Sequence, residues 1–251
     1  MNYAVGDIGN TLTKISLFGK NLKIIKSYNI ETDKIIKFNH QKNFFNKIFK
    51  KNTNKKILFS SVVPNAYKLI KLYLKKKKIK TCEIKDLKLE KIITLNIKMI
   101  NELGSDRIAN AIAAYDKYKK NCLIIDFGTA TTFDIIHKPG VYEGGVIAPG
   151  VKLSINNLNK STALLPVFSL KDNKKIYGKN TTEALNAGFL WGYQGLINNL
   201  IKKITLNGKK NYKIILTGGY ASFFKKFIDK KSTLDTNITI KGIIKIYKKL
   251  L

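Results

Sequence analysis

The chain has 251 residues, a length that fits one domain or two compact ones. Its 44% hydrophobic and 10% aromatic content excludes a disordered protein. The formal net charge of +31 is of a size that ordinarily indicates nucleic acid or an anionic membrane surface as a partner. However, only Arg107 among the 47 basic residues is arginine, the lysines are spread along the chain, and Asn and Ile are also abundant. We interpret the charge as an AT-rich coding bias and expect no nucleic-acid binding beyond non-specific attraction.

The cysteine content and the apolar runs predict where the protein resides. Two cysteines, Cys82 and Cys122, are too few and too far apart for a disulfide framework or a metal cluster. Asp7 interrupts the position at which a signal peptide would be apolar, and no run of uncharged apolar residues is long enough to span a membrane. We therefore expect a cytoplasmic protein without a membrane partner.

The first half of the chain alternates strand-like and helix-like patterns. Turn residues separate three short apolar runs at its start, which predicts a meander of antiparallel strands. An apolar strand then precedes Pro64, which favours the first turn of a helix, and an amphipathic helix closes the half. The predicted strands are 3–5, 12–18, 22–30 and 57–60, and the predicted helices are 44–49, 64–74 and 104–118.

The second half repeats this pattern. Residues 7–13 and 126–132 both place an Asp, a Gly two positions later and then hydroxyl or amide side chains at the bend between two strands. An apolar strand that breaks into a turn and a helix follows in each half. We predict a duplicated α/β fold with domains at 1–118 and 119–251. In the second domain we expect strands at 123–125, 133–137 and 214–216, and helices at 182–204 and 221–228.

The paired Asp-x-Gly bends indicate phosphate binding. Backbone N–H groups at such a bend form a concavity that binds anions, and the carboxylate can hold a cation or water nearby. A single Asp-x-Gly turn is commonly structural, but two copies favour a nucleotide gripped between two domains. This arrangement is similar to the superfamily of sugar kinases, actin and heat-shock ATPases, in which two ribonuclease H-like domains enclose a nucleotide cleft.

Six motifs in order resemble those of the type III pantothenate kinases. They are DIGNTLTK (7–14), LGSDRIANAIAAY (103–115), DFGTATTFD (126–134), GGVIAPG (144–150), GKNTTEALNAGFLWG (178–192) and TGG (217–219). The resemblance implies ATP-dependent phosphorylation of pantothenate to 4'-phosphopantothenate, the first step of coenzyme A biosynthesis. It also implies Mg²⁺ with ATP, a monovalent cation (potassium or ammonium) and a homodimer.

The resemblance also assigns roles to individual residues. Asp106 matches the proton acceptor, and Asp126 matches the ligand of the monovalent cation. The matches to substrate contacts are Gly104, Ser105, Asp106, Arg107 and Thr181. The matches to ATP contacts are Asp7, Ile8, Gly9, Asn10, Thr11, Leu12, Thr13, Lys14, Thr129, Gly218 and Gly219.

Physical reasoning about the substrate loop supports part of this assignment. Asp106 is expected in the first turn of the amphipathic helix, where the helix dipole favours an ionised carboxylate with a low pKa. Arg107 is the single arginine in a chain that otherwise uses lysine, which suggests a site that needs a planar, bidentate cation. The alternative is an ordinary helix start with Ser105 as its cap.

Each of the other matches has a structural alternative. Lys14 could be a solvated strand lysine, Asp126 with Thr129 a capped turn, and Thr181 a helix cap. Gly218 and Gly219 could serve only the turn between a strand and a helix.

The family's pattern is not followed everywhere. Ile97 and Ile100 stand where the family typically has an aromatic contact and a proline, and Ser105 replaces a small apolar residue. Two other functions stay open at this stage. One is a kinase-like regulator that binds nucleic acid, and the other is a different small-molecule kinase of the superfamily.

Overall fold

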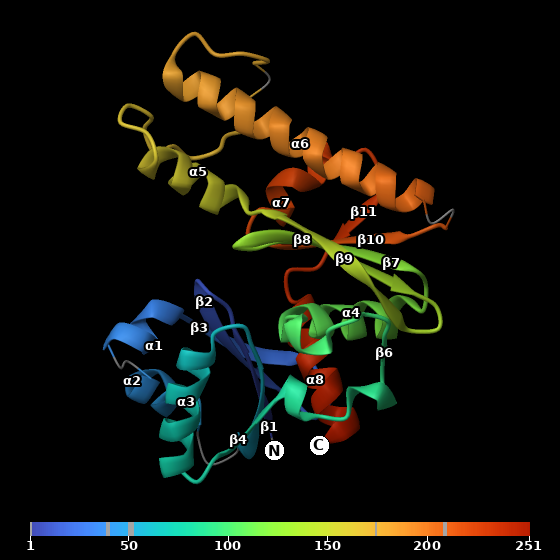
Figure 1. The fold of residues 1–251 in the computed structure, drawn as a ribbon. Helices are drawn as coiled ribbons and strands as arrows, with labels where there is room; N and C mark the ends of the chain where they lie inside the picture. Colours follow the sequence, from blue (N-terminus) through green and yellow to red (C-terminus); the bar gives the residue numbers. More distant parts are fainter. Residues whose placement is uncertain (1, 39–40, 50–52, 174, 208–209) are drawn as a thin grey trace. The chain divides into compact units, whose positions relative to one another are not determined.

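The computed structural model describes residues 2–38, 41–49, 53–173, 175–207 and 210–251 (Figure 1). The chain divides into two compact units. The first contains residues 1–119, 136–144 and 237–251, and the second contains residues 120–135 and 145–236. The first unit thus includes the C-terminal segment, which the sequence prediction assigned to a domain of residues 119–251. None of the helices in the described ranges is long and apolar enough to cross a membrane.

The first unit is built on a five-stranded sheet in the order β3-β2-β1-β4-β5. The strands β1, β2 and β3 form the predicted antiparallel meander, and β4 and β5 continue it in parallel. The carboxyl ends of β1 and β4 therefore lie side by side. The strands are β1 (Asn2–Ile8), β2 (Leu12–Phe18), β3 (Ile24–Glu31), β4 (Thr53–Ser61) and β5 (Lys80–Glu83).

Helices pack on both faces of this sheet. The strand residues Ile15, Ile57 and Phe59 form a core with Ile70 of α3 (Pro64–Lys76) and with Ile35 of α1 (Thr32–Phe38). The short α2 (Gln41–Asn46) also contacts α3. Side chains alternate between the two faces of a strand. The odd-numbered residues of β1 therefore lie on the face opposite to α1 and α3.

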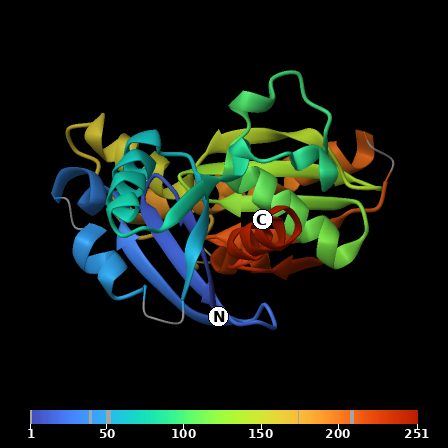
Figure 2. The same cartoon turned by 90° about the horizontal axis from the view of Figure 1, so that it is seen from below.

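The other face of the sheet meets α8 (Ile238–Leu250), which packs on β1 and β4, and α4 (Ser105–Tyr118), which packs on β4. The two helices lie side by side (Figure 2). Tyr3 of β1 makes an edge contact with Tyr247 of α8 at 5.6 Å between ring centroids. Gly242 of α8 is so close to Ala109 of α4 that a Cβ atom would overlap the carbonyl oxygen of Ala109. The predicted amphipathic helix α4 is therefore buried against a helix that the sequence patterns did not predict.

Between β5 and α4, residues 84–104 form short elements. They are the 3₁₀ turns η1 (Ile84–Asp86), η2 (Leu89–Lys91) and η3 (Ile100–Glu102) and the strand β6 (Thr94–Leu95). β6 pairs in parallel with the start of β9, which places Leu95 beside Tyr142.

The second unit repeats the strand arrangement of the first. Its sheet has the strand order β11-β10-β7-β8-β9. β6 pairs with the start of β9, at residues 141 and 142, which belong to the first unit. If β7 to β11 are matched in chain order to β1 to β5, the two sheets have the same strand order, read from opposite edges. A duplicated fold requires this match. The strands are β7 (Cys122–Phe127), β8 (Ala130–His137), β9 (Val141–Pro149), β10 (Lys213–Gly218) and β11 (Ser232–Leu234).

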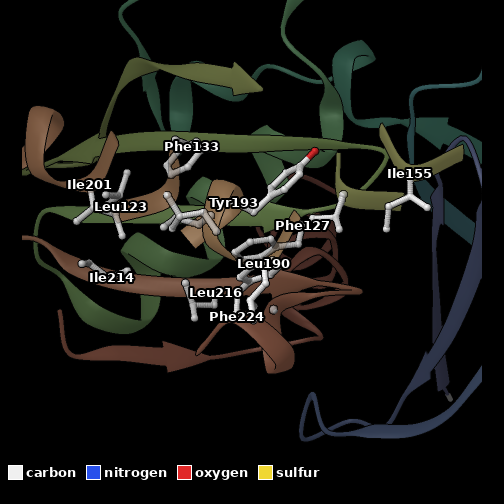
Figure 3. Packing of buried hydrophobic residues seen from close by; sticks show 14 residues of the cluster. Leu123, Phe127, Phe133, Ile155, Leu190, Tyr193, Ile201, Ile214, Leu216 and Phe224 are labelled. Atoms are coloured by element: carbon white, nitrogen blue, oxygen red, sulfur yellow. The ribbon is translucent and has the colours of Figure 1, made fainter. Parts of the chain in front are cut away.

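The core of the second unit lies between this sheet and the long helix α6 (Thr181–Asn207) (Figure 3). Phe127 of β7 stacks on Phe224 of α7 (Ala221–Phe224), with 5.5 Å between ring centroids. Tyr193 of α6 reaches the same cluster, and its hydroxyl lies 2.7 Å from that of Ser154 in α5 (Val151–Lys160). The 3₁₀ turn η4 (Lys225–Phe227) follows α7.

Candidate active site

The first predicted phosphate loop is a tight turn at the carboxyl end of β1. The backbone N–H of Gly9 donates to the carbonyl of Leu12 at 3.1 Å. The buried Thr32 braces the turn, because its hydroxyl donates to the carbonyl of Gly9 at 2.7 Å and lies 3.0 Å from the hydroxyl of Thr13. Asn10 and Thr11 are exposed at the tip.

The predicted ATP-binding residues of this loop thus divide into two groups. Ile8 and Thr13 are fully buried, so that their side chains belong to the core and only their backbone can face a ligand. Asn10, Thr11 and Leu12 are exposed, and Gly9, which precedes them, is partly exposed. Phosphate contacts from this loop would come from these exposed groups and from the backbone.

Asp7 and Lys14 are direct cross-strand partners in the β1–β2 ladder. Directly opposed residues share one face of a sheet, and that face is the one on which α8 packs. Burial lowers the pKa of the Lys14 ammonium, and the nearby negative charge of Asp7 opposes this shift. Lys14 is therefore half-buried and held beside a carboxylate, unlike a solvated strand lysine.

The predicted substrate loop is fixed to β4 through Ser105. The Ser105 hydroxyl accepts from the backbone N–H of Ser61 at 2.8 Å and donates to the carbonyl of Ser61 at 3.0 Å. Ser61 pairs with Ile8 in the β1–β4 ladder. Ser105 is thus not the helix cap, a position that Gly104 occupies. Its hydroxyl instead joins the start of α4 to the strand end beside the first phosphate loop.

Asp106 lies in the first turn of α4 as predicted, but the expectation of a low pKa was wrong. Burial raises the pKa of its carboxyl, and this effect exceeds the opposing hydrogen bond and charge of Arg107 and the charge of Lys85. The backbone N–H of Arg107 donates to Asp106 Oδ1 at 2.8 Å. A carboxylate with a raised pKa is a better proton acceptor than an exposed one.

The neighbouring Arg107 is directed over the ring of the buried Tyr142. Its guanidinium carbon lies 6.0 Å from the ring centroid, at the limit of a cation–π interaction. The backbone of Tyr142 accepts from Asn96 at 2.9 Å, and Asn96 also donates through its side chain to Glu143 at 2.8 Å. The position of Arg107 is thereby linked to the residues that precede Ile97.

In the second unit, four predicted residues lie at the carboxyl ends of two adjacent strands. Thr217 pairs with Asp126 and Gly218 with Phe127 in the parallel β7–β10 ladder. Thr129 is exposed in the bend after β7, next to Gly128, whose N–H donates to the carbonyl of Ala130 at 3.0 Å. Parallel strand ends are the edge at which α/β sheets bind ligands. Asp126, Thr129, Gly218 and Gly219 are therefore brought together.

The backbone at Gly218 closely approaches the Asp126 carboxylate. Gly218 has φ +88°, and a Cβ atom there would lie 2.5 Å from both Asp126 Oδ1 and the backbone nitrogen of Phe127. Glycine thus leaves room at the carboxylate. Within the described residues, Asp126 is not part of any group of three metal-binding side chains.

The last predicted substrate contact, Thr181, is the first residue of α6. Asn180 caps this helix, because its side chain accepts from the backbone N–H of Glu183 at 2.9 Å. The Thr181 side chain is exposed and lines a groove of about 580 Å³ between α5 and α6. The other walls of this groove are mostly apolar and include Leu158, Leu185, Phe189 and Leu196.

Three residues at these sites were not predicted from the sequence. Thr32 braces the first loop, Tyr142 lies under Arg107, and Asn237 accepts a hydrogen bond from Lys14 at 2.6 Å. All three are distant in sequence from the residues they contact, and no local pattern marks them. Only the tertiary structure shows these pairs.

Comparisons with known proteins define the class of this fold. A glucomannokinase of Arthrobacter that uses inorganic polyphosphate or ATP superposes with a TM-score of 0.53 at 11% identity, covering 99% of both chains. A Campylobacter jejuni protein described as a Baf family transcriptional activator superposes with a TM-score of 0.62 at 23% identity, covering 98% of both chains. At these identities the likeness concerns the fold alone, which is the two-domain, actin-like fold of the sugar kinases.

Sequence comparison is more specific. A family model for type III pantothenate kinase matches residues 4–203. The type III pantothenate kinase of Pelagibacter ubique is 45% identical over 242 residues, which cover 96% of each chain. The chain belongs to the type III pantothenate kinase family. The regulator that the sequence left open is not favoured by these matches.

Proposed function

We propose that the protein transfers the γ-phosphoryl group of ATP to the primary hydroxyl of pantothenate. The products are 4'-phosphopantothenate and ADP, at the first step toward coenzyme A. Family membership supports this reaction. The observation that carries it is the placement of Asp106 and Arg107 at the start of α4, which Ser105 ties to the strand end beside the first phosphate loop.

Asp106 is the proton acceptor in this proposal. The pantothenate hydroxyl oxygen attacks the γ-phosphorus, the bond from that phosphorus to the bridging oxygen of ADP breaks, and the hydroxyl proton passes to the Asp106 carboxylate. Phosphoryl transfer has a loose transition state, so positioning and charge contribute more than strong base catalysis. The raised pKa of Asp106 suits a group that collects a proton late.

The remaining groups bind the two substrates and neutralise the charge of the phosphates. Asn10, Thr11 and Lys14 of the first loop, and Thr129, Gly218 and Gly219 of the second unit, contact the nucleotide. Arg107 binds the pantothenate carboxylate, for which a guanidinium has the matching geometry, and Thr181 supplies a further substrate contact. Mg²⁺ that arrives with ATP offsets phosphate charge. The reaction takes place in the reducing cytoplasm, in keeping with the free thiols of Cys82 and Cys122.

We propose that the apolar groove between α5 and α6 is covered by a second copy of the chain. An apolar surface of this kind on a soluble enzyme marks an interaction site, and the family resemblance favours a homodimer. Sedimentation equilibrium should give about twice the chain mass of 28.4 kDa. A single-chain mass at enzyme concentrations used for assays would argue against the dimer.

Asp126 predicts dependence on a monovalent cation. The expected rate in potassium or ammonium is about tenfold that in sodium alone, which corresponds to about 1.4 kcal/mol of charge stabilisation. Asp126→Asn should abolish this difference because it removes the anionic ligand. Initial rates of ADP release in matched chloride salts measure both effects. Equal rates of the unaltered protein in all three salts would contradict the cation site.

Substrate choice tests the proposed function. Purified protein with ATP, Mg²⁺ and potassium is offered pantothenate, pantetheine or common sugars, and ADP release is followed. We expect rapid release with pantothenate and only the background hydrolysis with sugars. Sugar-dependent release without a response to pantothenate would instead indicate another small-molecule kinase of this fold.

A further inference from the structure

Lys14 and Asn237 are 223 positions apart in the chain and form a short hydrogen bond. The Lys14 ammonium donates to Asn237 Oδ1 at 2.6 Å. Asn237 immediately precedes α8 and is the first residue of the first unit after the chain leaves the second unit at Thr236. The contact therefore joins the strand after the first phosphate loop to the point at which the chain passes between the units.

The Asn237 side chain does not cap its own helix. Asn at this position commonly accepts a hydrogen bond from the first turn of a helix. Here the side chain makes no capping bond to α8. Its amide oxygen accepts a hydrogen bond from Lys14 instead, so that the side chain does not stabilise the start of α8 by capping.

The hydrogen bond to Asn237 can fix the orientation and the protonation of the Lys14 ammonium. A lysine side chain has four rotatable bonds and loses much conformational freedom when it is fixed on a phosphate. Burial also disfavours its charged form, whereas Asp7 across the ladder favours it. An amide oxygen at 2.6 Å orients the ammonium and stabilises its proton without adding a second negative charge that would repel phosphate.

We propose that Asn237 is a positioning residue for ATP, acting through Lys14. It holds the Lys14 ammonium beside Asp7 before the nucleotide arrives, so that less ordering is needed when the phosphates bind. The inference rests on the proposed function, in which Lys14 contacts the nucleotide. Asn237 itself need not touch ATP.

The test compares Asn237→Ala, Asn237→Asp, Lys14→Met and the double variant Lys14→Met/Asn237→Ala in the complete protein. Asn237→Ala should raise KM for ATP about fivefold to tenfold, which is within the net contribution of one intramolecular hydrogen bond, and change kcat little. Lys14→Met should raise KM further. The double variant should match Lys14→Met alone, because Asn237 acts only through Lys14.

The pH profile separates positioning from a structural role. Lys14 binds phosphate when protonated, so kcat/KM for ATP falls as pH rises through its pKa. Among the described groups, Asp7 is the charged neighbour that opposes the lowering of the Lys14 pKa. The residue paired with Lys14 on β3 is Asn29, which is uncharged. Asn237→Ala should move the alkaline midpoint to lower pH, and Asn237→Asp should move it to higher pH. A merely structural contact would lower stability and leave the midpoint in place.

Thr239→Ala, a substitution in the first turn of α8 that keeps Asn237 as the acceptor of the Lys14 hydrogen bond, is the matched control and should keep the original KM and midpoint. An active enzyme whose Asn237→Ala variant keeps both values, or whose double variant is additive, would overturn the inference. If the unaltered protein does not respond to pantothenate, the proposed function fails. Calorimetric binding of ADP to the same variants still tests the Lys14–Asn237 link in that case.

Discussion

Asp106→Asn is expected to lower kcat about a hundredfold or more, in the range found for loss of a general base. The amide has nearly the shape of the carboxylate and can still accept the backbone N–H of Arg107. It cannot take up the proton of the substrate hydroxyl. KM for ATP should therefore stay nearly unchanged, and steady-state rates of ADP release measure both constants.

The same variant should not be less stable. Burial raises the pKa of Asp106, which means that the folded protein disfavours its ionised form at neutral pH. Removing that charge should leave the urea midpoint unchanged or raise it. Asp33→Asn, in an exposed ion pair with Lys37 on α1, serves as the control and should keep full activity. Full activity of Asp106→Asn would eliminate its role as proton acceptor.

The pH dependence of activity in the unaltered enzyme also tests Asp106 as the proton acceptor. Asp106 must be ionised to accept a proton, so activity falls as pH falls through its pKa. Because burial raises that pKa, the acid limb should lie above the ordinary range of an aspartate.

Gly242→Ala is expected to destabilise the first unit by about 2–3 kcal/mol, as for overpacking in a close-packed interior. The added methyl would overlap the backbone carbonyl of Ala109, and neither helix backbone can move aside as a flexible side chain could. α4 carries Asp106 and Arg107, so a displaced helix should also lower activity. The free energy of unfolding in urea measures the loss.

Gly195→Ala in α6 is the matched control for this substitution. Gly195 is also helical, but it is exposed and an added Cβ would meet nothing within 4 Å. Alanine there should raise stability by about 0.5–1 kcal/mol, because glycine is the poorer helix former. Equal urea midpoints for the two alanine variants would contradict the close packing of α8 on α4.

Local patterns predicted most of the strands and the helix that carries Asp106. The meander of β1 to β3 has alternating apolar residues and clear turns, and α4 has a strong amphipathic stripe. α5 and α8 were not predicted. The sequence of α8, ITIKGIIKIYKKL, is rich in β-branched isoleucine, which favours strands in isolation. It is helical because its apolar side packs on α4 and on β1.

In the candidate site too, local motifs could be predicted from the sequence and tertiary contacts could not. Asp7, Asp106 and Asp126 could be selected because each stands in a short motif with a chemical meaning. The raised pKa of Asp106 could not be predicted, because it depends on burial that the helix-dipole argument ignores. Asn237 could not be found either, since the contact with Lys14 spans almost the whole chain.

The central claim is that phosphate is transferred to pantothenate, and identification of the product tests it most directly. Protein, ATP, Mg²⁺, potassium and pantothenate are incubated together, and the products are analysed by phosphorus NMR and mass spectrometry. The account predicts 4'-phosphopantothenate and ADP in equal amounts, with about a hundredth or less of each product from Asp106→Asn during the initial-rate period. Unmodified pantothenate beside accumulating ADP, or no reaction at all, would contradict it.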